Sequence, residues 1–157
     1  MSQDVLSQAM LGQFRRTLAM FREAAQTFPA EEWRAGDLDY LRPAGVAYHI
    51  VETIDFYAGD QSANQFPWGA RFGASWEEAQ SERLPSQKQV LGYLDDVEAK
   101  LKMWLVSADL SAPEQAFPWT GPIQLARAVY LLRNTQHHVA EMSLELTRRG
   151  YPAPSWR

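Results

Sequence analysis

Hydrophobic residues recur every three or four positions in four long segments of the chain, which is the spacing of one face of an α-helix. The segments span residues 3–27, 43–59, 86–107 and 122–149. The second segment carries a single apolar arc, formed by Val46, Ala47, Ile50, Val51, Ile54 and Tyr57. No stretch of useful length alternates apolar and polar residues as a strand does. The pattern therefore predicts an all-α protein.

Residues that start and stop helices stand at the ends of these segments. Ser86 and Gln89 have the spacing of a capping box, which predicts that the third helix begins there. We expect Gly121 to cap the start of the fourth helix and Pro122 to lie in its first turn. Gly150 is expected to end that helix as its C-cap.

The connections between the segments differ in length. Residues 60–85 form a long one, rich in glycine, proline and aromatic residues, with a short helix expected near residues 75–80. Residues 108–121 form a shorter loop, and the tail after Gly150 is expected to be extended because Pro152 and Pro154 exclude a helix. The sequence shows no repeat or domain boundary. We therefore predict one domain over residues 1–157, a four-helix bundle with a long crossover between the second and third helices.

Composition narrows the classes of function. The net charge of −4 gives no basic face for phosphates, so nucleic acid is not an expected partner. No apolar run reaches the roughly 18 residues that span a bilayer, and the first residues lack the pattern of a signal peptide. The chain has no cysteine, hence no disulfide and no thiolate ligand, which fits a cytoplasmic protein.

The three histidines carry most of any metal or acid–base hypothesis. On a helical wheel His49 falls about 130° from the centre of the apolar arc of its helix, at the margin where a side chain reaches a groove. His138 lies at the edge of the apolar arc of the fourth helix, whereas His137 projects toward the polar side. His49 and His138 are therefore the candidates to meet. The alternative is that each only forms a hydrogen bond with a neighbour.

Aromatic residues also stand out in the two long loops: Trp68, Phe72, Trp76 and Trp119. They can cover the histidines as a lid or anchor the loops to the bundle, and we favour anchoring because an ordered loop needs apolar contacts. On the polar side of the fourth helix, Arg127 and Arg133 are expected to form surface salt bridges.

Three stretches resemble the DinB/YfiT-like superfamily of helical-bundle proteins. They are Tyr48-His49-Ile50-Val51-Glu52, the run LLRNTQHHVAEM at residues 131–142, and GYPAP at residues 150–154. The resemblance extends over essentially the whole chain in the order and length of the helices. It implies a four-helix bundle with the long crossover already expected, and often a homodimer.

The resemblance also implies a metal site built from one histidine of the second helix and a His-x-x-x-His pair of the last. His49 matches the first ligand and His138 the last, but Asn134 stands at the middle position. An amide oxygen is a much poorer ligand than imidazole for zinc, nickel or iron. Glu52 and Glu141, each three residues after a histidine, are the nearest substitutes. Their His-x-x-Glu order is the reverse of the Glu-x-x-His typical of di-iron bundles, which we disfavour.

Three outcomes stay open for such a site: it holds no metal, it holds metal weakly, or it serves as a polar pocket. If the protein is an enzyme, the resemblance implies metal-assisted transferase-type chemistry on a small thiol, whose pKa a bound metal lowers. His137 or Glu141 then moves protons. The alternative is a non-catalytic module that binds a small ligand or forms a dimer without metal.

Overall fold

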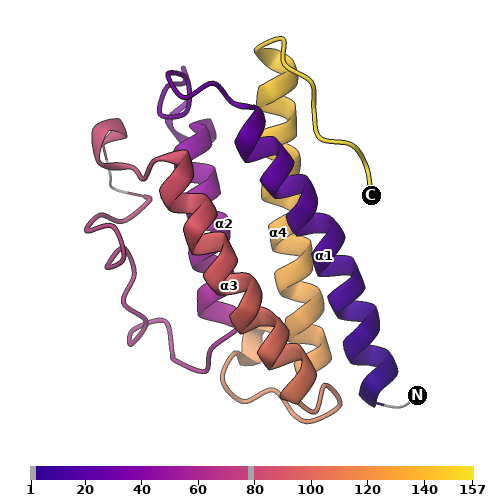
Figure 1. The fold of residues 1–157 in the computed structure, drawn as a ribbon. Helices are drawn as coiled ribbons and strands as arrows, with labels where there is room; N and C mark the ends of the chain where they lie inside the picture. Colours follow the sequence, from indigo (N-terminus) through magenta and orange to yellow (C-terminus); the bar gives the residue numbers. More distant parts are fainter. Residues whose placement is uncertain (1–2, 78–79) are drawn as a thin grey trace.

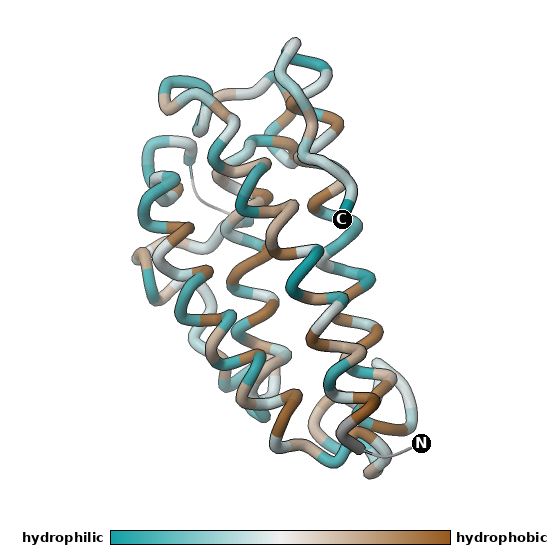
Figure 2. The backbone as a smooth tube through the Cα atoms, turned by 45° about the vertical axis from the view of Figure 1, so that its right-hand side comes forward, coloured by the Kyte–Doolittle hydropathy of each residue, from teal (hydrophilic) through white to brown (hydrophobic). Residues whose placement is uncertain are grey.

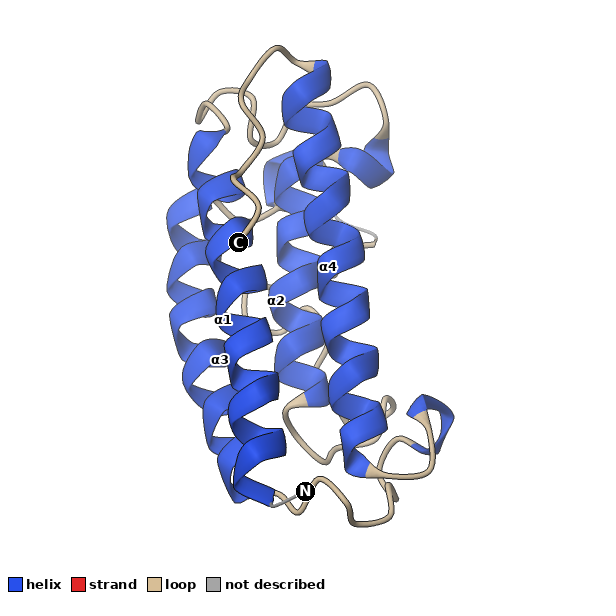
Figure 3. Ribbon diagram, turned by 90° about the vertical axis from the view of Figure 1, so that its right-hand side faces the viewer, coloured by secondary structure: helices blue, strands red, loops and turns tan. Residues whose placement is uncertain are grey.

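The computed structural model describes residues 3–77 and 80–157. They form four long helices: α1 (Gln3–Thr27), α2 (Pro43–Tyr57), α3 (Gln87–Ser107) and α4 (Gln124–Arg148). Three single-turn 3-10 helices lie in the connections: η1 (Asp39–Leu41), η2 (Ser81–Arg83) and η3 (Pro118–Thr120). The described residues contain no β-strand (Figure 3). The predicted all-α four-helix bundle is confirmed.

The helices form a four-cornered bundle in which each packs against two others. α1 contacts α3 and α4, and α2 contacts the same two helices. As Figure 1 shows, α1 and α4 run in one direction, while α2 and α3 both run in the other. Two neighbouring helices that run the same way need a connection as long as the bundle. The crossover between α2 and α3 provides it.

Apolar positions recur along each helix (Figure 2), as their amphipathic patterns predict. The core is rich in large aromatic side chains, since α1, α2 and the loops each contribute rings that are almost wholly buried. These are Phe14, Phe21, Phe28, Trp33, Tyr48 and Phe117.

α2 differs from the other three helices because it is buried on nearly every side. Of its 15 residues, only His49 and Asp55 are not buried. The crossover covers the face of α2 that the bundle leaves open: Phe72 packs edge-on against Tyr48 with ring centroids 5.2 Å apart, and Phe66 packs on Phe56 at 5.3 Å. The aromatic side chains of the crossover therefore anchor it, as the sequence predicts.

The helix ends agree with the sequence at α3 and depart from it at α4. Ser86 caps α3, and Gln89 completes the capping box. Gly150 follows α4 with a φ of 85°, as expected of a C-cap glycine. The predicted start of α4 is wrong: its N-cap is Ile123, with no side-chain hydrogen bond, and Pro122 precedes the helix.

A tertiary contact explains the late start of α4. Ile123 forms an isolated antiparallel bridge with Pro113, and the carbonyl of Pro122 accepts a hydrogen bond of 3.0 Å from the amide of Glu114. These contacts hold the chain extended up to Ile123, against the local preference of a proline for the first helical turn.

The crossover contains turns rather than the expected helix. Residues 76–77 form a turn and η2 begins at Ser81, while positions 78–79 of the helix expected near 75–80 lie outside the described residues. The C-terminal residues 151–157 have no regular secondary structure, in agreement with the extended tail that was predicted. Within the described part of the chain, no helix combines the length and the apolar character that a membrane span requires.

Candidate metal centre between the second and fourth helices

The bundle brings His49 of α2 and His138 of α4 into direct contact, although 89 residues separate them in the chain. Their Nε2 atoms lie 3.0 Å apart, and the two rings are nearly perpendicular, at 86°. Both side chains are half-buried. The helical wheel therefore identified the correct pair of histidines.

The other nitrogen of each ring is held from behind by a residue of the same helix. His138 Nδ1 lies 2.6 Å from Oε2 of Glu141, and His49 Nδ1 lies 3.3 Å from the hydroxyl of Thr53. An imidazole that donates its Nδ1 proton to such a partner turns the lone pair of Nε2 outward. This is the arrangement that carboxylates and carbonyls impose on histidines that bind metals.

Two Nε2 lone pairs cannot face each other at 3.0 Å without something positive between them. The first way to satisfy them is a proton on one ring, so that His49 and His138 share an ordinary hydrogen bond. The second is a metal ion. Two nitrogens that bind one zinc ion at about 2.0–2.1 Å lie about 2.9–3.4 Å apart for bond angles between the octahedral and tetrahedral values. The observed separation satisfies both arrangements.

Asn134, the residue that departs from the expected histidine, also points toward this region. It lies one turn before His138 in α4, and its side chain lines a cavity together with His49. The Oδ1 atom of Asn134 is buried, and no described residue gives it a hydrogen bond. Leaving a buried acceptor without a donor costs about 1–3 kcal/mol, so this oxygen is a candidate contact for a ligand or an ion.

Glu52 does not join the histidines, although its spacing from His49 equals that of Glu141 from His138. It is 2% exposed, and its Oε1 accepts a hydrogen bond of 2.6 Å from the amide of Gly69. Burial raises the pKa of Glu52, which favours the neutral acid. Its role is to hold the crossover, and we leave it out of the ligand set.

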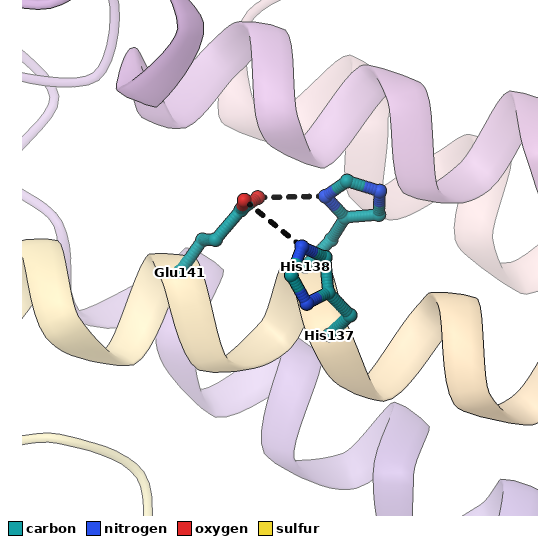
Figure 4. A group of neighbouring side chains, drawn as sticks. All are labelled: His137, His138 and Glu141. Atoms are coloured by element: carbon teal, nitrogen blue, oxygen red, sulfur yellow. Dashed lines mark hydrogen bonds and ion pairs between the residues drawn. The ribbon is translucent and has the colours of Figure 1, made fainter.

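His137 points outward and forms a second group on the surface of α4. Its side chain is 68% exposed, and its Nε2 lies 3.3 Å from Oε1 of Glu141. Figure 4 shows the carboxylate of Glu141 bridging the two neighbouring histidines. Ligand atoms of His137, His138 and Glu141 all lie within 4.8 Å of one another, so this group could also hold a metal ion.

Burial sets the charge of His49. Burial, and to a lesser extent the nearby His138, lower the pKa of the imidazole to about 4. His49 is therefore neutral at neutral pH. The neutral ring is the form that binds metal ions.

The histidine pair opens into a cleft of about 830 Å³ between α2, α4, η1 and the end of the crossover. Trp76 covers one side of His49, with the ring centroids 4.1 Å apart. The described residues that line the cleft include four carboxylates and one guanidinium: Asp39, Glu77, Glu82, Glu141 and Arg42. The cleft is thus acidic and large enough for a small molecule.

Two further residues contact His49, and neither was assigned to the metal site from the sequence. Thr53 follows His49 by four positions, the spacing of helix neighbours, and that signal was available. Trp76 is one of the four loop aromatics expected either to cover the histidines or to anchor the loops, and it lies against His49.

The comparisons with known proteins add no relative: no protein-family model matches the chain, and no curated protein matches it. Membership of the DinB/YfiT-like superfamily therefore stays a prediction from residues 48–52, 131–142 and 150–154.

Proposed function

We propose that this protein binds a divalent transition-metal ion between α2 and α4, through the Nε2 atoms of His49 and His138. The observation that carries the proposal is the pair of Nε2 atoms 3.0 Å apart, each on a ring whose Nδ1 has its own partner. Asn134 Oδ1, buried and without a donor among the described residues, is the third candidate ligand. The acidic lining of the cleft also favours a cation.

Two imidazoles and an amide make a weaker site than three imidazoles, so we expect moderate affinity. Zinc, nickel and iron all accept this donor set. If the protein is an enzyme, a small thiol is the substrate class that the resemblance implies. The metal would then stabilise the thiolate, while Glu141 orients His138 and accepts or returns a proton.

The test is metal analysis of protein purified without an affinity tag, then dialysed against zinc, nickel or ferrous iron. We expect about one ion per chain in the wild type. His49→Ala and His138→Ala should abolish uptake, whereas Asn134→His should tighten it.

His137→Ala is the matched control, because this neighbouring imidazole belongs only to the outward group with Glu141. If His49→Ala still takes up metal but His137→Ala does not, the ion binds the surface group of His137, His138 and Glu141 instead. If neither the wild type nor Asn134→His takes up metal, the metal-binding proposal is wrong.

A second candidate function is a metal-free binding module. It is favoured by the same 3.0 Å separation, since a hydrogen bond between the two Nε2 atoms needs no ion. Nitrogen-15 NMR of the metal-free protein distinguishes the two states. A hydrogen bond between the rings gives one protonated and one unprotonated Nε2 signal. If the module binds no metal, both signals stay unchanged when zinc is added.

A further inference from the structure

A second cavity also borders His49, and it lies between α2, α4 and the two long loops. Its volume is about 460 Å³. Six of its twelve described lining residues carry aromatic rings, and they come from α2, the crossover, the loop before α4 and α4 itself. The rings are Phe56, Tyr57, Trp68, Trp76, Trp119 and Tyr130.

These rings contact one another, and the indole N–H groups of Trp68 and Trp119 are already engaged. The Phe56 and Trp68 ring centroids lie 4.9 Å apart, and those of Tyr57 and Tyr130 lie 5.4 Å apart. The indole N–H of Trp68 donates to the carbonyl of Ala63 at 3.0 Å, and that of Trp119 donates to the hydroxyl of Tyr57 at 3.1 Å. Trp68 and Trp119 therefore offer a ligand mainly their π-electron surface.

The polar part of the lining is formed by His49, Thr53, Ser75, Glu77 and Asn134. Among its described lining residues there is one carboxylate, Glu77, and no lysine or arginine. Asn134 contributes the buried Oδ1 that lacks a donor. Two guanidinium groups lie outside this lining: that of Arg127 donates to the carbonyl of Tyr57 at 2.8 Å, and that of the exposed Arg133 lies 5.5 Å from the Tyr130 ring. Glu77 thus carries the one formal charge of the described lining, and Asn134 leaves one acceptor to be satisfied.

We propose that this aromatic cavity binds a small organic ammonium ion, which donates an N–H to Asn134 Oδ1 and places its charge against the rings and Glu77. The faces of tryptophan and tyrosine attract cations, most strongly where water is excluded. An ammonium proton also satisfies an acceptor that is otherwise buried alone. A neutral apolar ligand would use the rings but leave Asn134 unpaired.

This inference does not depend on the metal site, although an ion bound to Asn134 would compete for the same oxygen. The binding experiment therefore uses full-length protein treated with EDTA. Isothermal calorimetry compares three probes of similar shape: cyclohexylmethylammonium, the neutral cyclohexylmethanol and the anionic cyclohexanecarboxylate. We expect the ammonium to bind about tenfold more tightly than the alcohol, and the carboxylate to bind least.

Substitutions then assign the binding to this cavity. Asn134→Ala and Trp119→Leu should each weaken ammonium binding by at least about threefold. Trp156→Leu is the control, since Trp156 lies in the tail and is 82% exposed. Its affinity should equal that of the wild type. If circular dichroism shows that either cavity variant is misfolded, Glu77→Gln replaces it, because Glu77 is exposed and its substitution should lower the preference for ammonium over alcohol.

Three results would overturn the proposal: no binding of the ammonium, a preference over the alcohol below about threefold, or affinity that the cavity variants leave unchanged. Failure to take up metal in the dialysis experiment would leave these measurements unaffected, so the two proposals fail separately.

Discussion

His49 belongs to the almost wholly buried helix α2 and also lines the cleft. With Asp55 it is one of the two residues of α2 that are not buried. Its ring is enclosed by Trp76, Thr53 and His138. This enclosure keeps the imidazole neutral, because the charged form would lose hydration that these neighbours do not replace.

The charge state of His49 predicts how stability depends on pH in metal-free protein. Its pKa is about 4 in the folded state, against 6.5 for an ordinary histidine. Between these values the unfolded chain binds the proton and the folded chain does not. The free energy of unfolding should therefore fall as the pH drops from 6.5 to 4, by at most about 3 kcal/mol from this residue.

Urea denaturation at several pH values, in the wild type and in His49→Gln, checks this prediction. Glutamine keeps a polar side chain of similar reach but has no proton to gain. The difference in unfolding free energy between the two proteins should shrink on acidification. Parallel pH profiles would show that His49 is not the group responsible.

The sequence predicted some residues of the site and could not predict others, for a physical reason. His49 and His138 were found because their positions on a helix follow from local periodicity. Glu52 and Glu141 have the same spacing from a histidine, yet Glu141 binds His138 while Glu52 is buried under the crossover. Which face of a helix becomes covered is decided by distant parts of the chain.

Arg127 is a second residue whose surroundings are set by a distant part of the chain, and the expectation of a surface salt bridge is wrong for it. It was expected in a surface salt bridge but is 4% exposed, and its guanidinium lies 3.6 Å from the buried carboxylate of Glu114. The guanidinium also contacts the carbonyl of Tyr57 and sits 4.3 Å from the ring centres of both Trp104 and Phe117. The loop before α4 folds over Arg127, and helix periodicity contains no information on that loop.

Among the elements, the crossover decides how α2 and the histidine pair are covered. One of its fixed points is Gly69, whose amide donates to Glu52 and whose φ is 75°. A Cβ added there would lie 2.8 Å from backbone atoms of Ala74 and Ser75. Both the backbone conformation and the lack of space therefore require glycine at this position.

Gly69→Ala should destabilise the protein more than Gly73→Ala, and the two form a matched pair. Gly73 has a similar φ of 71°, but a Cβ there meets nothing within 4 Å. Gly73→Ala should cost about 1 kcal/mol from backbone strain alone. Gly69→Ala should cost about 2 kcal/mol more, because the tightly packed backbone must move.

Urea denaturation gives both values, and limited proteolysis shows whether the crossover of Gly69→Ala is cut first. Equal losses of stability in the two variants would mean that the contacts around Gly69 do not hold the crossover.

The helices themselves were largely predictable, whereas their connections were not. α1 and α3 follow their apolar patterns because each has an amphipathic face. The capping box of α3 fixes where that helix begins. The turns of residues 60–85 depend on single contacts with α2, such as that of Gly69 with Glu52. No periodicity encodes such contacts.

For the whole molecule, the resemblance to the DinB/YfiT-like superfamily leads us to expect a homodimer. Light scattering coupled to size exclusion should then give twice the chain mass of 17.9 kDa. A mass that equals one chain throughout a dilution series would contradict this expectation. The same measurement on Leu144→Glu, whose leucine is 64% exposed on α4, tests whether that face is the contact.

The parallel course of α2 and α3 also has a consequence for how the molecule opens. α1 and α2 each pack against both α3 and α4, and these helix–helix contacts do not involve the crossover. The segment that carries Trp76 is tied mainly by side chains such as Phe66 and Phe72 and by the amide of Gly69. A segment with fewer fixed points than the bundle detaches at a lower free energy. We therefore expect the crossover to open before the four helices separate, which would widen the access that the cleft already gives to His49.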